Sequence, residues 1–300
     1  MDTAMNASAS SSPTASDLSD FSLSPAQFAA RLGRADAPLV LDVRRLPRFT
    51  ASPQLLPTAQ YCAPEDVQAF AARQPPREVL VYCVYGHEVS HDAAATLRAA
   101  GWDARYLVGG LEGGQPEVDS ADLLAELKAH NLPRVTKRPD FGVDGLTPSR
   151  WITRERPKID RIACPWLVRR FIDAQAVFFY VPKPEVFDEA AKRQATPYDI
   201  PGAPLEHDGA LCSFDTFLRA FGLHMPALDL LARIVRGADT DQLDLAAQSA
   251  GLLAVSLGFS RLYPTDDHAM LDAMMPVYDA LYAWCSDRVA ATDERHNWNP

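Results

Sequence analysis

Short runs of strand-forming residues alternate with helix-forming stretches through the first third of the chain. The expected strands are residues 39–44, 78–82 and 104–108, and the expected helices are residues 26–32, 64–73 and 90–100. Strands that alternate with helices over about 100 residues predict a small α/β domain with a mainly parallel sheet flanked by helices. Three prolines at residues 45–60 predict a loop there.

The rest of the chain has a mainly helical pattern. A helix is expected at residues 122–129, and the Pro- and Gly-containing residues 131–149 are expected to form a linker. Further helices are expected at 162–173, 185–194, 213–221, 226–236, 243–257 and 267–289, with a short strand at 176–181 standing apart. The predicted organisation is therefore a disordered Ser/Ala/Thr-rich tail (1–20), an α/β domain (21–115), a helix and linker (116–149), a mainly α-helical domain (150–290) and a second tail (291–300).

Composition agrees with two soluble domains. The chain has 300 residues, of which 47% are hydrophobic and 23% charged. It has no apolar run of the roughly 20 residues that a membrane span needs, and no secretory signal is expected at its N-terminus. The net charge of −10 makes nucleic-acid binding unfavourable. The five cysteines are scattered without CxxC spacing, so we expect thiols in a reducing cytoplasm rather than disulfides or a zinc knuckle.

Cys83 is the first candidate for chemistry. It ends an expected strand, and the residues after it lead into an expected helix. Unpaired backbone N–H groups and the helix dipole at such a position favour a thiolate or a bound oxyanion. The expected anion cradle is Val84, Tyr85, Gly86, His87, Glu88, Val89 and Ser90. A buried core cysteine is the alternative, and His87 either assists proton transfer or faces solvent.

Residues 21–115 resemble a rhodanese domain, a sulfurtransferase fold. The resemblance is carried by residues 41–44 (Leu-Asp-Val-Arg), by Val-Tyr-Cys at 81–83 with Gly86, and by residues 106–110 (Tyr-Leu-Val-Gly-Gly). It implies that Cys83 takes a sulfane sulfur from thiosulfate or a persulfide and passes it to a thiol acceptor, with no cofactor. It also implies that Asp42 and Arg44 form a supporting pair beside the site.

The cysteine loop departs from the family pattern Cys-x-x-Gly-x-x-Ser. Ser90 comes one residue late, which predicts a longer loop and a wider cradle, as in the related phosphatases and arsenate reductases. Phosphatase chemistry would lack its arginine, because none lies between Cys83 and Ser90. An oxyanion reductase is a further alternative, and it would need a resolving thiol such as Cys62.

Residues 150–290 look like the C-terminal domain of the ChrB family, which is linked to chromate resistance. The resembling segments are residues 151–167, 198–202, 207–215, 250–254 and 278–282. Some family members are chromate-responsive regulators, so a non-enzymatic chromate or redox sensor is the rival to a sulfurtransferase.

A basic cluster opens this second domain. Residues 150–170 hold seven basic and two acidic residues. Arginine and lysine are the usual binders of oxyanions such as chromate and sulfate. The candidates are Arg154, Arg156, Lys158 and Arg161. A solvated, salt-bridged helix face is an equally good interpretation.

A histidine, a thiol and carboxylates suggest a metal site in the same domain. The candidate ligands are His207, Cys212, Asp215, Glu155 and Asp160, with Cys164 and Asp239 as further members. This donor set suits zinc or iron. The spacing matches no fixed metal motif, so a structural histidine among acids is the alternative.

Overall fold

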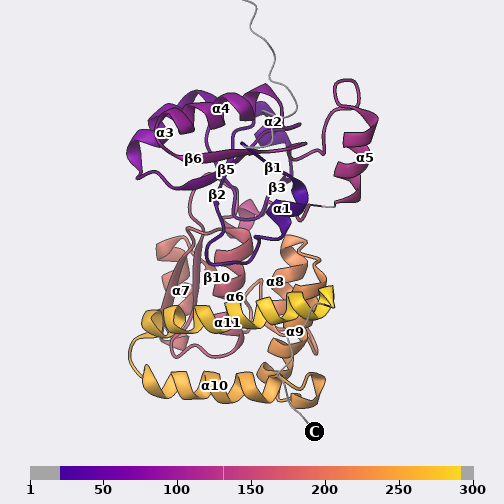
Figure 1. The fold of residues 1–300 in the computed structure, drawn as a ribbon. Coiled ribbons are helices and arrows are strands. Elements are labelled where there is room, and N and C mark those ends of the chain that lie inside the picture. The colour runs from indigo at the N-terminus through magenta and orange to yellow at the C-terminus, as the bar shows by residue number, and fades with distance from the viewer. Residues whose placement is uncertain (1–20, 131, 292–300) are drawn as a thin grey trace, which may run out of the picture.

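The computed structural model describes residues 21–130 and 132–291 (Figure 1). The predicted tails at 1–20 and 291–300 lie outside the described residues, apart from Ala291, which follows the last helix. The N-terminal half forms the upper part of the molecule in Figure 1, and the C-terminal half forms the lower part.

The N-terminal half contains the predicted parallel sheet with helices around it. Its strand order is β1 (Ser22–Leu23), β6 (Asp103–Leu107), β5 (Glu78–Tyr82), β2 (Leu39–Asp42) and β4 (Gln60–Tyr61), and every neighbouring pair is parallel. The helices are α1 (Pro25–Ala29), α2 (Leu46–Ala51), α3 (Val67–Arg73) and α4 (Glu88–Ala99). Apolar side chains of α3 and α4 cover the sheet face that is turned away from the C-terminal half (Figure 1).

The proline-rich residues 45–60 are not simply a loop, as the sequence analysis expected. They contain α2 and the short strands β3 (Gln54–Leu55) and β4. Pro47 is tolerated because it lies in the first turn of α2, where its missing N–H has no helical acceptor to lose. Phe49 on this helix is buried in the core.

The C-terminal half is largely helical, as predicted. Its helices are α6 (Asp160–Leu167), α7 (Val186–Arg193), α8 (Ser213–Phe221), α9 (Pro226–Asp239), α10 (Ser249–Leu262) and α11 (Asp267–Ala290). Shorter turns are η1 (Pro64–Asp66) and η2 (Pro139–Phe141) earlier in the chain, and η3 (Val168–Ile172), η4 (Lys183–Glu185) and η5 (Leu243–Leu245) here.

The expected isolated strand belongs to a sheet. β9 (Val177–Val181) pairs in parallel with β8 (Arg150–Arg154), and β8 pairs in parallel with β10 (Thr196–Pro197). β8 is not predicted by the sequence pattern, because the side chains in the middle of the strand are buried on both faces and show no polar–apolar alternation. The chain runs from the central strand β8 of this sheet through residues 155–159 into α6.

Residues 116–130 and 132–149 connect the two halves and contain secondary structure. They contain α5 (Ala121–Ala129) and β7 (Val135–Thr136), which pairs antiparallel with β3 of the N-terminal half. Val135, Phe141 and Val143 are buried, and the Phe141 ring contacts that of Phe221 on α8. The segment expected to be a linker therefore packs against both halves.

The two halves share one hydrophobic core. Phe28 and Leu32 near α1 belong to the same buried cluster as Phe171 and Tyr282 of the C-terminal half. None of the helices in the described ranges combines the length and the apolar character needed to cross a membrane.

Candidate functional site

Cys83 lies between β5 and α4, where the sequence analysis places it. Its side chain is buried, and its Sγ is 3.2 Å from Ser90 Oγ. No side chain caps the N-terminus of α4. Among the described residues, the backbone N–H groups of residues 84–89 have no hydrogen-bond acceptor. The sulfur thus lies at a helix N-terminus whose donors are available to an anion.

The cysteine loop is followed directly by helix α4. Helix α4 begins at Glu88, so only residues 84–87 lie between Cys83 and the helix. Ser90 belongs to the first helical turn, and its Oγ donates to the carbonyl of His87 at 3.0 Å. The first turn of the helix thus brings the Ser90 hydroxyl to the sulfur.

Gly86 lets the loop approach the segment after β6. Its φ is 79°, and a Cβ there would lie 2.7 Å from the backbone nitrogen of Gly109 and from the carbonyl oxygen of Leu107. The amide of Leu111 donates to the carbonyl of Cys83 at 3.0 Å, and that of Glu112 donates to Val84 at 2.9 Å. The Gly109–Gly110 motif is thus part of the structure that holds the loop.

His87 is paired with a carboxylate that lies outside the cysteine loop. Its Nε2 lies 3.0 Å from Asp119 Oδ2, and its side chain is partly buried. The same carboxylate accepts the backbone N–H of Gln115 at 2.6 Å. His87 therefore fastens the segment before α5 to the cysteine loop. Asp119 was not singled out, because nothing in its local sequence marks it as a partner of a residue 32 positions away.

Asp42 and Arg44 form a buried ion pair beneath the loop. Arg44 Nη2 lies 2.6 Å from Asp42 Oδ2, which also accepts the hydroxyl of Tyr82 at 2.7 Å. Arg44 donates further to the carbonyl of Gln54 at 3.1 Å. These contacts tie β2, β5 and β3 together. Arg44 also lines an open cleft beside the cysteine loop, together with Arg48 and Tyr85.

Cys62 is badly placed to act as a resolving thiol for Cys83. Tyr61 and Tyr82 both pair with Asp42 of the intervening strand β2, so the cysteines that follow them lie two strand spacings apart. That separation is about 9–10 Å, whereas a disulfide needs Cα atoms within about 7 Å. Burial also raises the pKa of Cys62 to about 11, which keeps it protonated.

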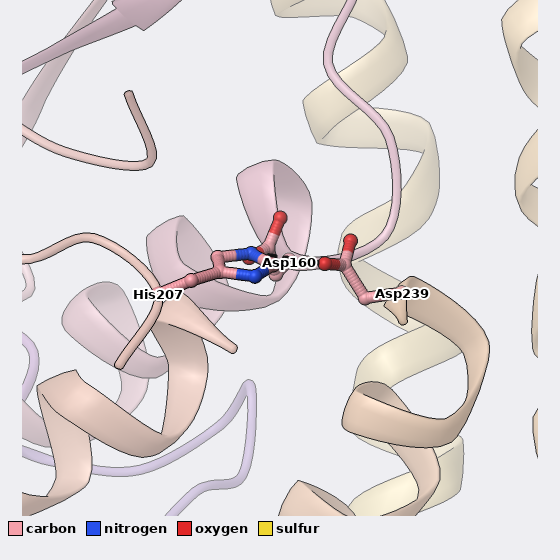
Figure 2. A group of neighbouring side chains, drawn as sticks. All are labelled: Asp160, His207 and Asp239. Atoms are coloured by element: carbon pink, nitrogen blue, oxygen red, sulfur yellow. Dashed lines mark hydrogen bonds and ion pairs between the residues drawn. The ribbon is translucent and has the colours of Figure 1, made fainter. Parts of the chain in front are cut away.

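A second cluster lies at the beginning of α6 in the C-terminal half (Figure 2). His207 Nε2 is 3.2 Å from Asp160 Oδ2, 3.1 Å from Asp239 Oδ2 and 3.4 Å from Asp199 Oδ1. Asp160 begins α6, Asp239 ends α9, and His207 lies on the loop before α8. Figure 2 shows the imidazole directed toward the two carboxylates that it labels.

The charges of this cluster perturb one another. Hydrogen bonds to Asp160 and Asp199 raise the pKa of His207 to about 10. Burial, reinforced by the charge of Asp199, raises the pKa of Asp160, and burial with the charge of Asp160 raises that of Asp239. Burial opposes ionisation of Asp199 as well, yet the hydrogen bond from His207 and the guanidinium of Arg161 lower its pKa.

Most of the side chains expected to bind an oxyanion instead bind oxygen atoms of the protein itself. Arg154 and Arg161 both contact Asp199 Oδ2, at 2.8 and 3.1 Å. Arg156 donates to the carbonyl oxygens of Pro264 and Ser260. Among the described residues, Lys158 has no ion-pair partner, and burial lowers its pKa. The interpretation as salt-bridged arginines thus describes Arg154 and Arg161, whereas the Arg156 guanidinium is held by backbone carbonyl oxygens.

The structure separates the expected metal ligands into two groups. Asp160 and His207 meet, joined by Asp239, whereas Cys212 and Asp215 form a capping box at the N-terminus of α8. Asp215 Oδ1 is paired with Arg236 at 3.0 Å. Glu155 is exposed. The sequence analysis missed Asp199, because its link to the cluster arises only when β10 brings it beside β8.

Strained backbone flanks this second cluster. Arg156, Ile159 and Asp199 have φ values of 60°, 41° and 49°. Such a value is a rare conformation for a β-branched residue such as Ile159. Its backbone is held by the hydroxyl of Tyr278, which donates to its carbonyl at 2.8 Å, and by Ser256 Oγ, which accepts its N–H at 3.2 Å. Strain of this kind collects at functional sites.

Comparisons with known proteins bear out both resemblances. Residues 24–117 match the model of the Rhodanese-like domain, and residues 151–285 match that of the ChrB C-terminal domain. Protein ChrB of Cupriavidus metallidurans is 35% identical over 133 residues, which make up 44% of this chain and 39% of that relative. The match thus spans about two fifths of the relative's length.

Solved structures resemble the N-terminal half. A rhodanese homolog from Thermus thermophilus is 33% identical, covering 31% of this chain and 98% of its own, with a TM-score of 0.26. A rhodanese-like domain protein from Staphylococcus aureus is 20% identical, covering 33% of this chain and 99% of its own, with a TM-score of 0.28. The two family models thus match separate parts of the chain, the Rhodanese-like domain at residues 24–117 and the ChrB C-terminal domain at residues 151–285.

Proposed function

We propose that the chain is a sulfurtransferase that carries sulfur as a persulfide on Cys83. The observation that supports this most directly is the position of Cys83 Sγ, 3.2 Å from Ser90 Oγ and beside the unused N–H groups of residues 84–89. Those donors suit the charge of a thiolate and then of a persulfide anion. The rhodanese-like domain match supports the same chemistry.

The proposed cycle has two displacements at sulfur. The Cys83 thiolate attacks the sulfane sulfur of thiosulfate, a new S–S bond forms, and the old one breaks with sulfite leaving on its electron pair. An acceptor thiolate, such as glutathione, or cyanide in an assay then attacks the outer sulfur. The Cys83 thiolate leaves and is ready for another cycle.

The cleft beside the loop is the proposed entry for the donor. Arg44, Arg48 and Tyr85 contribute to its lining. Arg44 is neutralised by Asp42, whereas Arg48 is exposed and suits an anionic sulfur donor. No metal or organic cofactor enters this cycle.

The test is intact-mass spectrometry after incubation with thiosulfate. The wild-type chain should gain about 32 Da and lose it again when cyanide is added, with thiocyanate released. Cys83→Ser should gain nothing, and the matched control Cys62→Ser should behave as wild type. An adduct that survives in Cys83→Ser, or none on the wild type, would contradict the proposal.

We further propose that the C-terminal domain links this chemistry to chromate resistance in the cytoplasm. The ChrB C-terminal domain match supports the link, and all five cysteines are buried thiols, as suits a reducing compartment. Because Arg154, Arg156 and Arg161 contact protein groups, Lys158 is the remaining candidate for a chromate or sulfate contact. Chromate tolerance of cells that express wild-type, Cys83→Ser or Lys158→Gln chains tests this.

A chromate or redox sensor is the second candidate function. It is favoured by the match of residues 151–285, which do not include Cys83, to the ChrB C-terminal domain. A chain that binds chromate reversibly but releases no thiocyanate from thiosulfate and cyanide would be such a sensor. The reductase alternative loses support from the separation of Cys62 and Cys83.

A further inference from the structure

We propose that Asp160, His207 and Asp239 bind a divalent transition-metal ion, zinc(II) or iron(II), in the C-terminal domain. Each residue offers one ligand atom, and the three atoms lie within 4.8 Å of one another. The side chains come from the beginning of α6, the loop before α8 and the end of α9 (Figure 2). This site goes beyond the sulfur chemistry proposed for Cys83 and does not depend on it.

The donor set selects the class of metal. An imidazole nitrogen with carboxylate oxygens suits zinc or iron, whereas magnesium and calcium prefer oxygen alone. Asp199 Oδ1, 3.4 Å from His207 Nε2, is in place as a further oxygen ligand. Its other oxygen is held by Arg154 and Arg161, which fix its orientation as outer partners of metal ligands commonly do.

A buried thiol lies on the same helix as Asp160. Cys164 lies one helical turn after Asp160 on α6, so both side chains project from the same face. The thiol is fully buried, and among the described residues it has no hydrogen-bond partner. Cys164 therefore places a soft sulfur on the Asp160 face of α6, although the group of ligand atoms itself consists of Asp160, His207 and Asp239.

The cluster is also accessible. The side chain of His207 is 40% exposed, whereas that of Asp160 is 2% exposed. His207 lines an open cleft together with Glu206 and Asp208. An ion can therefore enter past the imidazole and reach the buried carboxylates. On binding, His207 Nε2 gives its proton to solvent and its lone pair to the metal.

The test is metal binding by the full chain. The purified protein is stripped with a chelator and titrated with zinc, and the metal that remains after desalting is measured. Wild type should retain one zinc ion per chain. His207→Ala and the nearly isosteric Asp239→Asn should each weaken zinc binding by about 10-fold or more. Magnesium should not compete at equal concentration.

Matched controls separate this site from adventitious binding. His224 is exposed at a distance from the cluster in sequence, and Asp229 is exposed on the same helix as Asp239. His224→Ala and Asp229→Asn should bind zinc as wild type does. Cys83→Ser should also retain its zinc, because Cys83 is not part of the site. Equal retention by His207→Ala, Asp239→Asn and the controls, or loss of the ion in Cys83→Ser, would overturn the proposal.

Discussion

At the scale of single residues, Ser90 is the side chain that most directly touches the proposed reaction. Its Oγ lies between Cys83 Sγ, at 3.2 Å, and the carbonyl of His87, at 3.0 Å. With a neutral thiol, the hydroxyl donates to His87 and accepts from sulfur. With a thiolate, it can turn and donate to the sulfur instead.

Ser90→Ala should therefore slow sulfur transfer without unfolding the chain. A hydrogen bond to a charged group contributes about 1.5–3 kcal/mol, which corresponds to a rate loss of about 10- to 100-fold. The measurement is thiocyanate formation at saturating thiosulfate. Thr96→Ala, which removes another hydroxyl from α4, should leave the rate unchanged. Equal rates for Ser90→Ala and wild type would show that the hydroxyl does not contact the reacting sulfur.

The Asp42–Arg44 pair should matter to stability more than to chemistry. Both side chains are almost completely buried, so Asp42→Asn leaves the Arg44 charge without its partner. Breaking a buried pair in this way costs about 3–5 kcal/mol of unfolding free energy. Urea denaturation checks it. Asp36→Asn, which removes the exposed partner of Arg34, should cause no measurable change. Equal midpoints for the two variants would contradict the supporting role.

At the scale of elements, the conformation of the cysteine loop depends on its close approach to the backbone of the segment after β6. Gly86 and Gly113 have nearly the same φ, 79° and 81°, but different surroundings. A Cβ on Gly86 would meet three backbone atoms at 2.7–2.8 Å, whereas one on Gly113 would meet nothing within 4 Å. The two positions thus separate backbone strain from close packing.

Gly86→Ala should accordingly damage the site far more than Gly113→Ala. The control, Gly113→Ala, should lower the free energy of unfolding only by the cost of placing alanine in the left-handed conformation, about 1–2 kcal/mol. Gly86→Ala adds the displacement of rigid backbone, about 1–3 kcal/mol more, and moves the N–H groups around Cys83. Thermal unfolding and persulfide formation are measured on both. Full persulfide formation by Gly86→Ala would mean that the loop tolerates displacement.

The contrast between the two sites shows what sequence reasoning can reach. The Cys83 site is local: the strand, the loop and the helix with Ser90 follow one another within residues 78–99, so their order in the sequence predicts their placement. The Asp160 cluster is assembled from residues up to 79 positions apart, by the pairing of β8 with β10 and the packing of α6, α8 and α9. Cys212 and Asp215 were expected to be metal ligands because they are close to His207 in sequence. In the structure they cap helix α8, and a helix cap uses some of the same residue types as a metal site.

At the scale of the whole molecule, the two domains are parts of one packed unit. A Cβ on Gly33 would lie 2.5 Å from the rings of Phe171 and Tyr282, which belong to the other half. β7 of the connecting segment pairs with β3, and the amide of Tyr61 donates to the carbonyl of Gly145 at 2.7 Å. The halves should therefore unfold together rather than as independent domains.

Phe171→Ala tests this coupling, because the substitution lies in the C-terminal half but its ring belongs to the shared core. Removing a buried phenylalanine costs about 3–5 kcal/mol. If the unit is cooperative, hydrogen exchange should accelerate equally in β5 of the N-terminal half and in α9. Phe187→Ala, at an exposed position on α7, is the control and should change neither. Acceleration confined to α9 would mean that the rhodanese-like domain holds its fold, and the Cys83 loop, without support from its neighbour.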